Sequence, residues 1–128
     1  TFKNPVVWAD VPDPDVIRVG DYFYMVSTTM HLMPGAPVMR SKDLVNWEHH
    51  PVAIEPNGLG TVFSGSSVVD KENVAGFGKD AIIAIYTSAG ASQIQSLAYS
   101  TDNGRTFQTY KHNPIITADR EAREYFLP

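Results

Sequence analysis

The chain has 128 residues, of which 43% are hydrophobic and 19% are charged. That length fits one modest domain, and the balance of apolar and charged residues is typical of a folded protein. A formal net charge of −4, with ten Lys and Arg spread along the chain, argues against nucleic acid or an anionic membrane as the main partner. Zero cysteines exclude disulfides, iron–sulfur centres, thiolate zinc and cysteine nucleophiles. No apolar run approaches the roughly 18 residues of a membrane span.

The first half of the chain reads as a series of short β-strands. Two apolar runs are joined by Gly20-Asp21, which is a hairpin signal, and a loop at 29–36 precedes the next run. The expected strands are Val16–Val19, Tyr22–Thr28, Pro37–Arg40 and Trp47–His50. Four such strands in about 40 residues predict an antiparallel meander.

The same pattern starts again in the second half. Ala81–Ser88 (AIIAIYTS) is strongly apolar, as expected of a strand covered on both faces. The expected strands are Val62–Asp70, Ala81–Ser88, Gln95–Ser100 and Phe107–Tyr110. The charged stretch Thr117–Glu124 is expected to form a helical turn or a loop.

The two halves look like repeats of one another. Tyr22–Thr28 aligns with Ala81–Ser88, and RSKDLVNWE aligns with YSTDNGRTFQ, which gives a period of about 60 residues. A repeat of four strands is typical of propeller blades. The predicted fold class is therefore all-β, with two four-stranded β-propeller blades in tandem. The predicted boundaries are 1–55 and 56–118 for the blades and 119–128 for a C-terminal tail.

The turn that follows Ser100 resembles the Asp-box of propeller blades. Asp102 is placed to accept backbone N–H groups of its own turn, and Gly104 supplies a positive φ. Phe107 is expected to plug the hairpin into its blade. The motif is therefore interpreted as structural, with no catalytic role.

An acidic segment precedes the first strand. Asp10, Asp13 and Asp15 lie close together and are stiffened by Pro12 and Pro14. Clustered carboxylates suit hard cations, but there is no EF-hand spacing or glycine pivot, so loop capping is favoured over a metal site. No metal and no cofactor is expected.

The histidines do not change that expectation. His49 and His50 are adjacent in an expected strand, where successive side chains point to opposite faces, so a shared metal is not expected.

The acidic segment carries a resemblance to a known family. Asn4–Glu48, with PDPDVIRVGDYFYM and SKDLVNW in order, resembles the first blade of glycoside hydrolase family 43. That family includes β-xylosidases and arabinofuranosidases on a five-bladed propeller. The resemblance implies that Asp13 holds the place of the general base, which activates a water in an inverting glycosidase. It also implies that the loop with His31 lines a sugar pocket; a partly buried loop residue is the equally weighted alternative for His31.

The second half resembles a different family. Val62–Ile116 resembles the second blade of glycoside hydrolase family 32, the invertases, levanases and inulinases, also on a five-bladed propeller. Its FSGS element implies that Phe63 and Ser64 contact the sugar, although packing is the favoured role of Phe63 in this chain. The two blocks meet near Glu55–Thr61, which predicts an engineered chimera of two propeller fragments.

Two departures from these families bear on activity. The WMNDPNG-type nucleophile motif of family 32 is missing, and Leu127 stands where that family has its stabilising Asp. The favoured hypothesis is therefore a recombined, self-assembling structural fragment without hydrolytic activity. The alternatives are a glycoside hydrolase or sugar binder acting on arabinose-, xylose- or fructose-containing glycans with Asp13 as general base, and one half of a split enzyme.

Two blades alone are expected to expose two large apolar lateral faces. The expected partners are copies of the same chain that complete a closed ring, with a trimer of six blades favoured over a dimer of four. A small sugar is the other candidate partner. The sequence does not indicate a cellular location.

Overall fold

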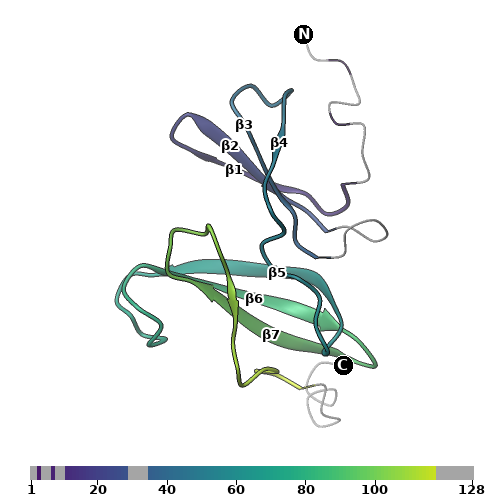
Figure 1. The fold of residues 1–128 in the computed structure, drawn as a ribbon, viewed down its shortest axis with the longest axis vertical. Helices are drawn as coiled ribbons and strands as arrows, with labels where there is room; N and C mark the ends of the chain where they lie inside the picture. Colours follow the sequence, from purple (N-terminus) through teal and green to yellow (C-terminus); the bar gives the residue numbers. More distant parts are fainter. Residues whose placement is uncertain (1–2, 4–6, 8–10, 29–34, 118–128) are drawn as a thin grey trace, which may run out of the picture.

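The computed structural model describes residues 3, 7, 11–28 and 35–117. Over these residues the chain forms eight β-strands in two antiparallel sheets of four strands each (Figure 1). The described part of the chain contains no helix with the length and apolar character needed to cross a bilayer. The predicted all-β fold class is confirmed.

The first sheet has the strand order β1-β2-β3-β4. Its strands are β1 (Asp15–Val19), β2 (Tyr22–Val26), β3 (Val38–Ser41) and β4 (Glu48–His49). Val19 pairs with Tyr22 across the predicted two-residue turn, where Gly20 has a φ of 60°. A positive φ at this position is what a tight hairpin turn requires, and glycine adopts it without a steric penalty.

The second sheet repeats this order as β5-β6-β7-β8. Its strands are β5 (Thr61–Asp70), β6 (Ala81–Ala89), β7 (Gln93–Ser100) and β8 (Gln108–Thr109). All eight predicted strands are present. The fourth strand of each sheet is shorter than predicted, although its pairing continues through His50 N–H to Val38 O at 2.8 Å and Tyr110 N–H to Leu97 O at 2.9 Å.

The core lies on the face of the second sheet that is turned toward the first. Its buried hydrophobic residues are Ile54, Val62, Ala84, Tyr86 and Ala98, with Ala36, Ala53 and Phe107 packed against them. Ile54 belongs to the linker between the sheets, and that linker is held to the segment just before β3 by Ala36 N–H to Ile54 O (3.3 Å) and Ala53 N–H to Ala36 O (3.1 Å). The linker therefore packs on the second sheet while it is hydrogen-bonded to the segment just before β3.

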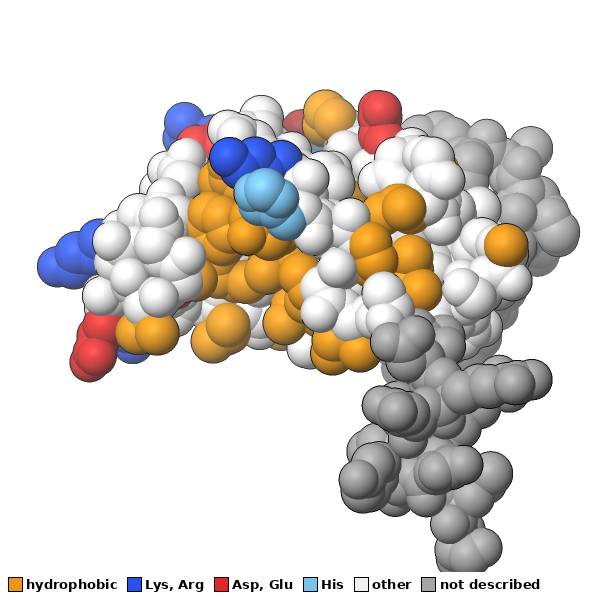
Figure 2. All heavy atoms as spheres, turned by 90° about the horizontal axis from the view of Figure 1, so that it is seen from below, with side chains coloured by type: hydrophobic (Ala, Val, Ile, Leu, Met, Phe, Trp, Pro, Cys, Tyr) orange, Lys and Arg blue, Asp and Glu red, His pale blue; other side chains and the backbone are white. Residues whose placement is uncertain are grey.

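The outer faces of the two sheets differ in exposure. Met25 and Met39 pair directly in the first sheet and are only 6% and 3% exposed. On the second sheet, Val68 is 64% exposed and Ile85 is 38% exposed. Figure 2, seen from below the second sheet, shows hydrophobic side chains gathered on this side. Large hydrophobic side chains are thus exposed on both sheets, since Val16, Ile17 and Val19 of β1 are 43%, 57% and 55% exposed, although Met25 and Met39 are covered.

Both sheets close their third turn with the same Ser–Asp hydrogen-bond pattern. Ser41 Oγ donates to Asp43 Oδ1 at 3.0 Å, and Ser100 Oγ donates to Asp102 Oδ1 at 2.7 Å. Each Asp then accepts two backbone N–H groups further along its turn, at 2.8 to 3.0 Å. The predicted structural role of the Asp-box is confirmed, and the first half contains an equivalent turn. This shared hydrogen bonding supports the repeat predicted from sequence.

These hydrogen bonds favour the ionised carboxylates. The backbone and side-chain donors of Thr106, followed by the Ser100 hydroxyl, hold the pKa of Asp102 well below its usual range. The backbone and side-chain donors of Asn46, followed by the Val45 N–H, do the same for the pKa of Asp43. Each carboxylate therefore stabilises its turn only while it is ionised.

Replacing Asp102 by Asn should weaken the fold at neutral pH and reduce its loss of stability in acid. Because the pKa of Asp102 is lower in the folded chain than the ordinary 3.8, its contribution is present above pH 3.8 and lost as the pH falls below it. Urea unfolding of both proteins between pH 7 and pH 2.5 measures this. Asp21→Asn, at an exposed turn position of the first sheet, is the matched Asp-to-Asn control. Parallel pH profiles for wild type and Asp102→Asn would contradict the prediction.

Candidate functional site

A cavity of about 340 Å³ opens between the two sheets. The first-sheet side contributes Asp13, Asp15, Val26, Ser27, Thr28, Ala36, Val38, Ala53 and Ile54, and the second-sheet side contributes residues 62–67, 84–86 and Phe107. This volume lies at the lower end of the range of small-molecule sites. The cavity is therefore large enough for one small ligand.

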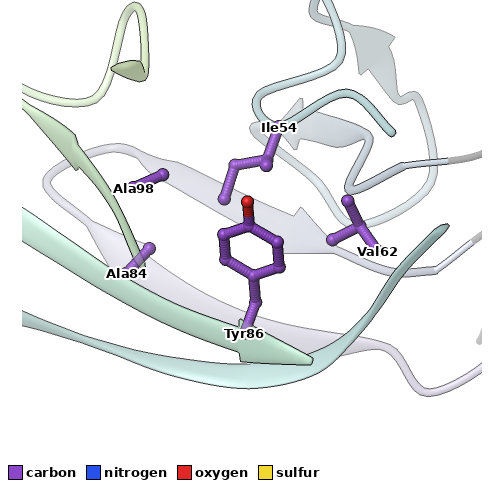
Figure 3. Packing of buried hydrophobic residues seen from close by; sticks show 5 residues of the cluster. All are labelled: Ile54, Val62, Ala84, Tyr86 and Ala98. Atoms are coloured by element: carbon purple, nitrogen blue, oxygen red, sulfur yellow. The ribbon is translucent and has the colours of Figure 1, made fainter. Parts of the chain in front are cut away.

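The cavity has a polar rim and an apolar floor. Asp13, Asp15 and Ser64 line it and are exposed. Figure 3 shows the floor, where the ring of Tyr86 rises from β6 and its hydroxyl points toward Ile54. A ligand in the cavity would therefore contact carboxylates and a serine hydroxyl at the rim, and mainly apolar groups at its inner end.

Asp13 sits on the rim in an unusual backbone conformation. It lies between Pro12 and Pro14 and has a φ of 49°, in the left-handed region that Asp tolerates better than most residues. The preceding Pro12 carbonyl accepts the Thr28 N–H at 3.2 Å, which ties the acidic segment to the end of β2. Such a conformation costs on the order of 1–3 kcal/mol and persists where its surroundings hold it, as at many functional sites.

Phe63 and Ser64 reach the cavity through a β-bulge. The register of β5 against β6 shifts between Phe63 and Gly65, so Ser64 is an extra residue outside the ladder. A Cβ on Gly65 would come within 2.1 Å of the Ile85 carbonyl oxygen and 2.7 Å of the Tyr86 Cα. The bulge therefore depends on glycine at position 65, where the two backbones approach closely.

The structure brings together three of the predicted site residues and leaves one outside the described part. Asp13, Phe63 and Ser64 line the same cavity, whereas His31 lies outside the described residues. Phe63 is half-buried, which is consistent with a packing role as well as a contact at the cavity wall. The structure shows that these three residues lie at one cavity, and their roles in binding a sugar stay predictions.

Sequence reasoning did not single out Tyr86, and it considered Asp15 only as a metal ligand or, preferably, as a loop-capping carboxylate. Tyr86 belongs to the apolar run of β6, where period-2 alternation places it on the same face as Ala84. That alternation was visible in the sequence, but the cavity in front of the face was not.

The described residues suggest no metal centre. Among them, no group of three or more His, Cys, Asp or Glu is placed to hold an ion. His49 is exposed and His50 is half-buried in the same sheet. The chemistry that the cavity offers is that of carboxylates and hydroxyls: proton acceptance at Asp13 and Asp15, and hydrogen bonding to a polar ligand at the serines.

Family profiles match both halves of the chain. The profile of the glycosyl hydrolases family 32 N-terminal domain matches residues 37–126, and that of glycosyl hydrolases family 43 matches residues 2–64. The two resemblances stated from sequence are confirmed, and the matched regions overlap at 37–64. The chain belongs to the family defined by the glycosyl hydrolase family 32 N-terminal domain.

Curated relatives support this assignment. A levanase of Bacillus subtilis is 44% identical over 123 residues, covering 90% of this chain and 18% of the levanase. A levanbiose-producing levanase of the same species is 40% identical over 124 residues, covering 90% of this chain and 24% of that protein. The chain therefore spans about a fifth of the length of these relatives.

Solved structures give the same fold. A fructofuranosidase from Schwanniomyces occidentalis, complexed with fructose, matches with a TM-score of 0.67 and 32% identity over 84% of this chain and 25% of that chain. A thermostable family-43 glycoside hydrolase matches with a TM-score of 0.62 and 23% identity over 86% of this chain and 35% of that chain. The two sheets are accordingly blades of the β-propeller that these glycoside hydrolases share.

Substituting Gly65 by Ala should destabilise the chain by about 3 kcal/mol, because the new methyl group overlaps backbone atoms of β6. Gly58→Ala is the matched control, since a Cβ there meets nothing within 4 Å. Urea unfolding of the two variants measures the difference. Equal stabilities would show that the bulge accepts a side chain at position 65.

Proposed function

We propose that this chain forms part of the sugar-binding cavity of a glycoside hydrolase that acts on fructose-containing glycans. The observation that carries the proposal is the convergence of Asp13, Phe63 and Ser64 on one cavity between the sheets. These residues come from segments that resemble two different glycosidase families. The names of the relatives, levanase and fructofuranosidase, favour a fructosyl ligand over a pentosyl one.

In this proposal Asp13 acts as general base. Its carboxylate stands on the exposed rim, where it can accept a proton from a water molecule that attacks the anomeric carbon. Phe63 supplies an apolar wall, and the Ser64 hydroxyl hydrogen-bonds the sugar. Hydrolysis also needs an acidic carboxyl group at a separation of about 5–9.5 Å, depending on mechanism. Asp15 is the other carboxylate of this cavity.

Binding of fructose and of short levan oligosaccharides by the 128-residue chain tests the proposal. Ser64→Ala should weaken binding roughly three- to tenfold through the loss of one hydrogen bond. Ser92→Ala, at an exposed position between β6 and β7 that does not line the cavity, should bind as wild type. Absence of sugar binding by the wild-type chain would contradict the proposal.

Turnover is tested separately, with levan, sucrose, nitrophenyl arabinofuranoside and nitrophenyl xyloside as substrates. Asp13→Asn should abolish any hydrolysis because an amide cannot accept the proton, while Asn still tolerates a positive φ. Sugar binding should persist in this variant. Turnover that survives Asp13→Asn would assign the general base to another residue.

A second candidate is a self-assembling structural unit without hydrolytic activity. It is favoured by the exposed apolar side chains on the outer face of the second sheet, such as Val68 and Ile85. The match to two family profiles supports an origin of this unit by recombination. The alignment of a single levanase with 90% of the chain supports common descent instead. The candidate therefore rests on its surface and not on its origin.

Light scattering after size exclusion tests self-assembly, and Val68→Lys should lower the measured mass by placing a charge on the exposed face. A mass of three chains would support a closed ring of six blades. A mass of two would support pairing through the outer face of the second sheet, which needs no uncovering of Met25 and Met39. A monomer at all concentrations would contradict both arrangements.

A further inference from the structure

Tyr86 carries a buried hydroxyl that the fold does not use. It lies in the middle of β6 and is only 3% exposed. Its Oη has no hydrogen-bond partner among the described residues. A buried hydroxyl without a partner opposes folding, because it loses its hydrogen bonds to water and gains none in return.

The surroundings of this hydroxyl explain why the fold leaves it unpaired. The ring packs in the cluster of Ile54, Val62, Ala84 and Ala98, whose side chains are aliphatic, and the hydroxyl points away from its own sheet toward Ile54 (Figure 3). A buried water needs two to four polar partners to be held in place. The cluster around the ring offers no second polar side chain.

Packing alone does not account for a tyrosine at this position. Phenylalanine would fill the same space without burying a hydroxyl. Tyr99 on β7 provides the contrast, because its hydroxyl donates to Gln108 Oε1 at 3.0 Å and lies outside the cavity. The hydroxyl of Tyr86 is therefore left without a role in the fold of the described residues.

We infer that the hydroxyl of Tyr86 binds a hydroxyl group of the sugar in the cavity between the sheets. The inference rests on the function proposed above and adds a residue to it. Tyr86 lines the same cavity as Asp13 and Ser64, but it is buried where they are exposed. The rim residues bind the outer side of the sugar, and Tyr86 binds a hydroxyl at its inner end.

The ligand class follows from this pairing of groups. A ligand hydroxyl near the phenol must belong to a molecule with an apolar surface that packs against the aliphatic floor. The C–H face of a sugar ring is such a surface. A free ion or a charged group would lose its hydration against Ile54 and Val62 without gaining a charged partner at that end. A compact, uncharged sugar of one ring satisfies both conditions.

The test compares Tyr86→Phe with Tyr99→Phe, which removes the same atom on the other face of the second sheet. Fructose is titrated into the wild-type chain and both variants by calorimetry, and urea unfolding is measured without sugar. Tyr86→Phe should bind fructose roughly five- to tenfold more weakly, and Tyr99→Phe should bind as wild type. Without sugar, Tyr86→Phe should be at least as stable as wild type, since no hydrogen bond is lost.

The outcomes separate this inference from the function on which it rests. If the wild-type chain binds fructose and Ser64→Ala weakens binding while Tyr86→Phe does not, the proposed function stands and the role of Tyr86 is overturned. If the wild-type chain binds no fructose, both are overturned. A marked loss of stability in Tyr86→Phe without sugar would give its hydroxyl a structural partner and would also overturn the inference.

Discussion

The packing of Ile54 against β6 is the contact on which the rest of the structure depends. Each sheet is a short antiparallel meander, and such units need a second layer to bury an apolar face. Ile54 follows the first sheet in the chain yet lies in the core of the second, beside Ala84 and Tyr86. This contact brings the first sheet against the second and creates the cavity between them. Without it, Asp13 and Ser64 would belong to separate units and could not face one ligand.

The outer turns and the inner strands of each sheet are stabilised in different ways. The outer turns are closed by Ser–Asp hydrogen bonds that need nothing from the neighbouring sheet, which is why the same pattern serves both repeats. The inner strands depend on their neighbours, and there the repeats diverge: β1 is exposed along its length, whereas β5 is longer and contains a bulge. Local bonding therefore preserves the repeat at the periphery, and the cavity region is where the two blades have become different.

The strands were predictable from sequence because glycines, prolines and Asp-rich turns separate short apolar runs, and because the two repeats confirm each other. The convergence of Asp13, Phe63 and Ser64 came from family resemblance, since no local pattern shows which segments meet across two sheets. Tyr86 was missed for a related reason: alternation assigns it to a face, but only the packed structure shows a cavity before that face. The burial of Met25 and Met39 was not predicted from the sequence, because the exposure of a sheet face depends on what packs on it.

The bulge in β5 reverses the alternation of the strand halfway along its length. Before it, Val62 pairs with Ser88 on the buried face, and after it, Gly65 and Ser67 pair with Tyr86 and Ala84 on that same face. The side chains of β5 thus alternate between the two faces in one pattern before Ser64 and in the opposite pattern after it. Substitutions on the Thr61–Ser64 side can alter what the cavity wall offers a ligand without changing which residues of the remaining strand face the core. The bulge thereby lets both halves of a strand that lines the cavity from Val62 to Ser67 keep their own alternation.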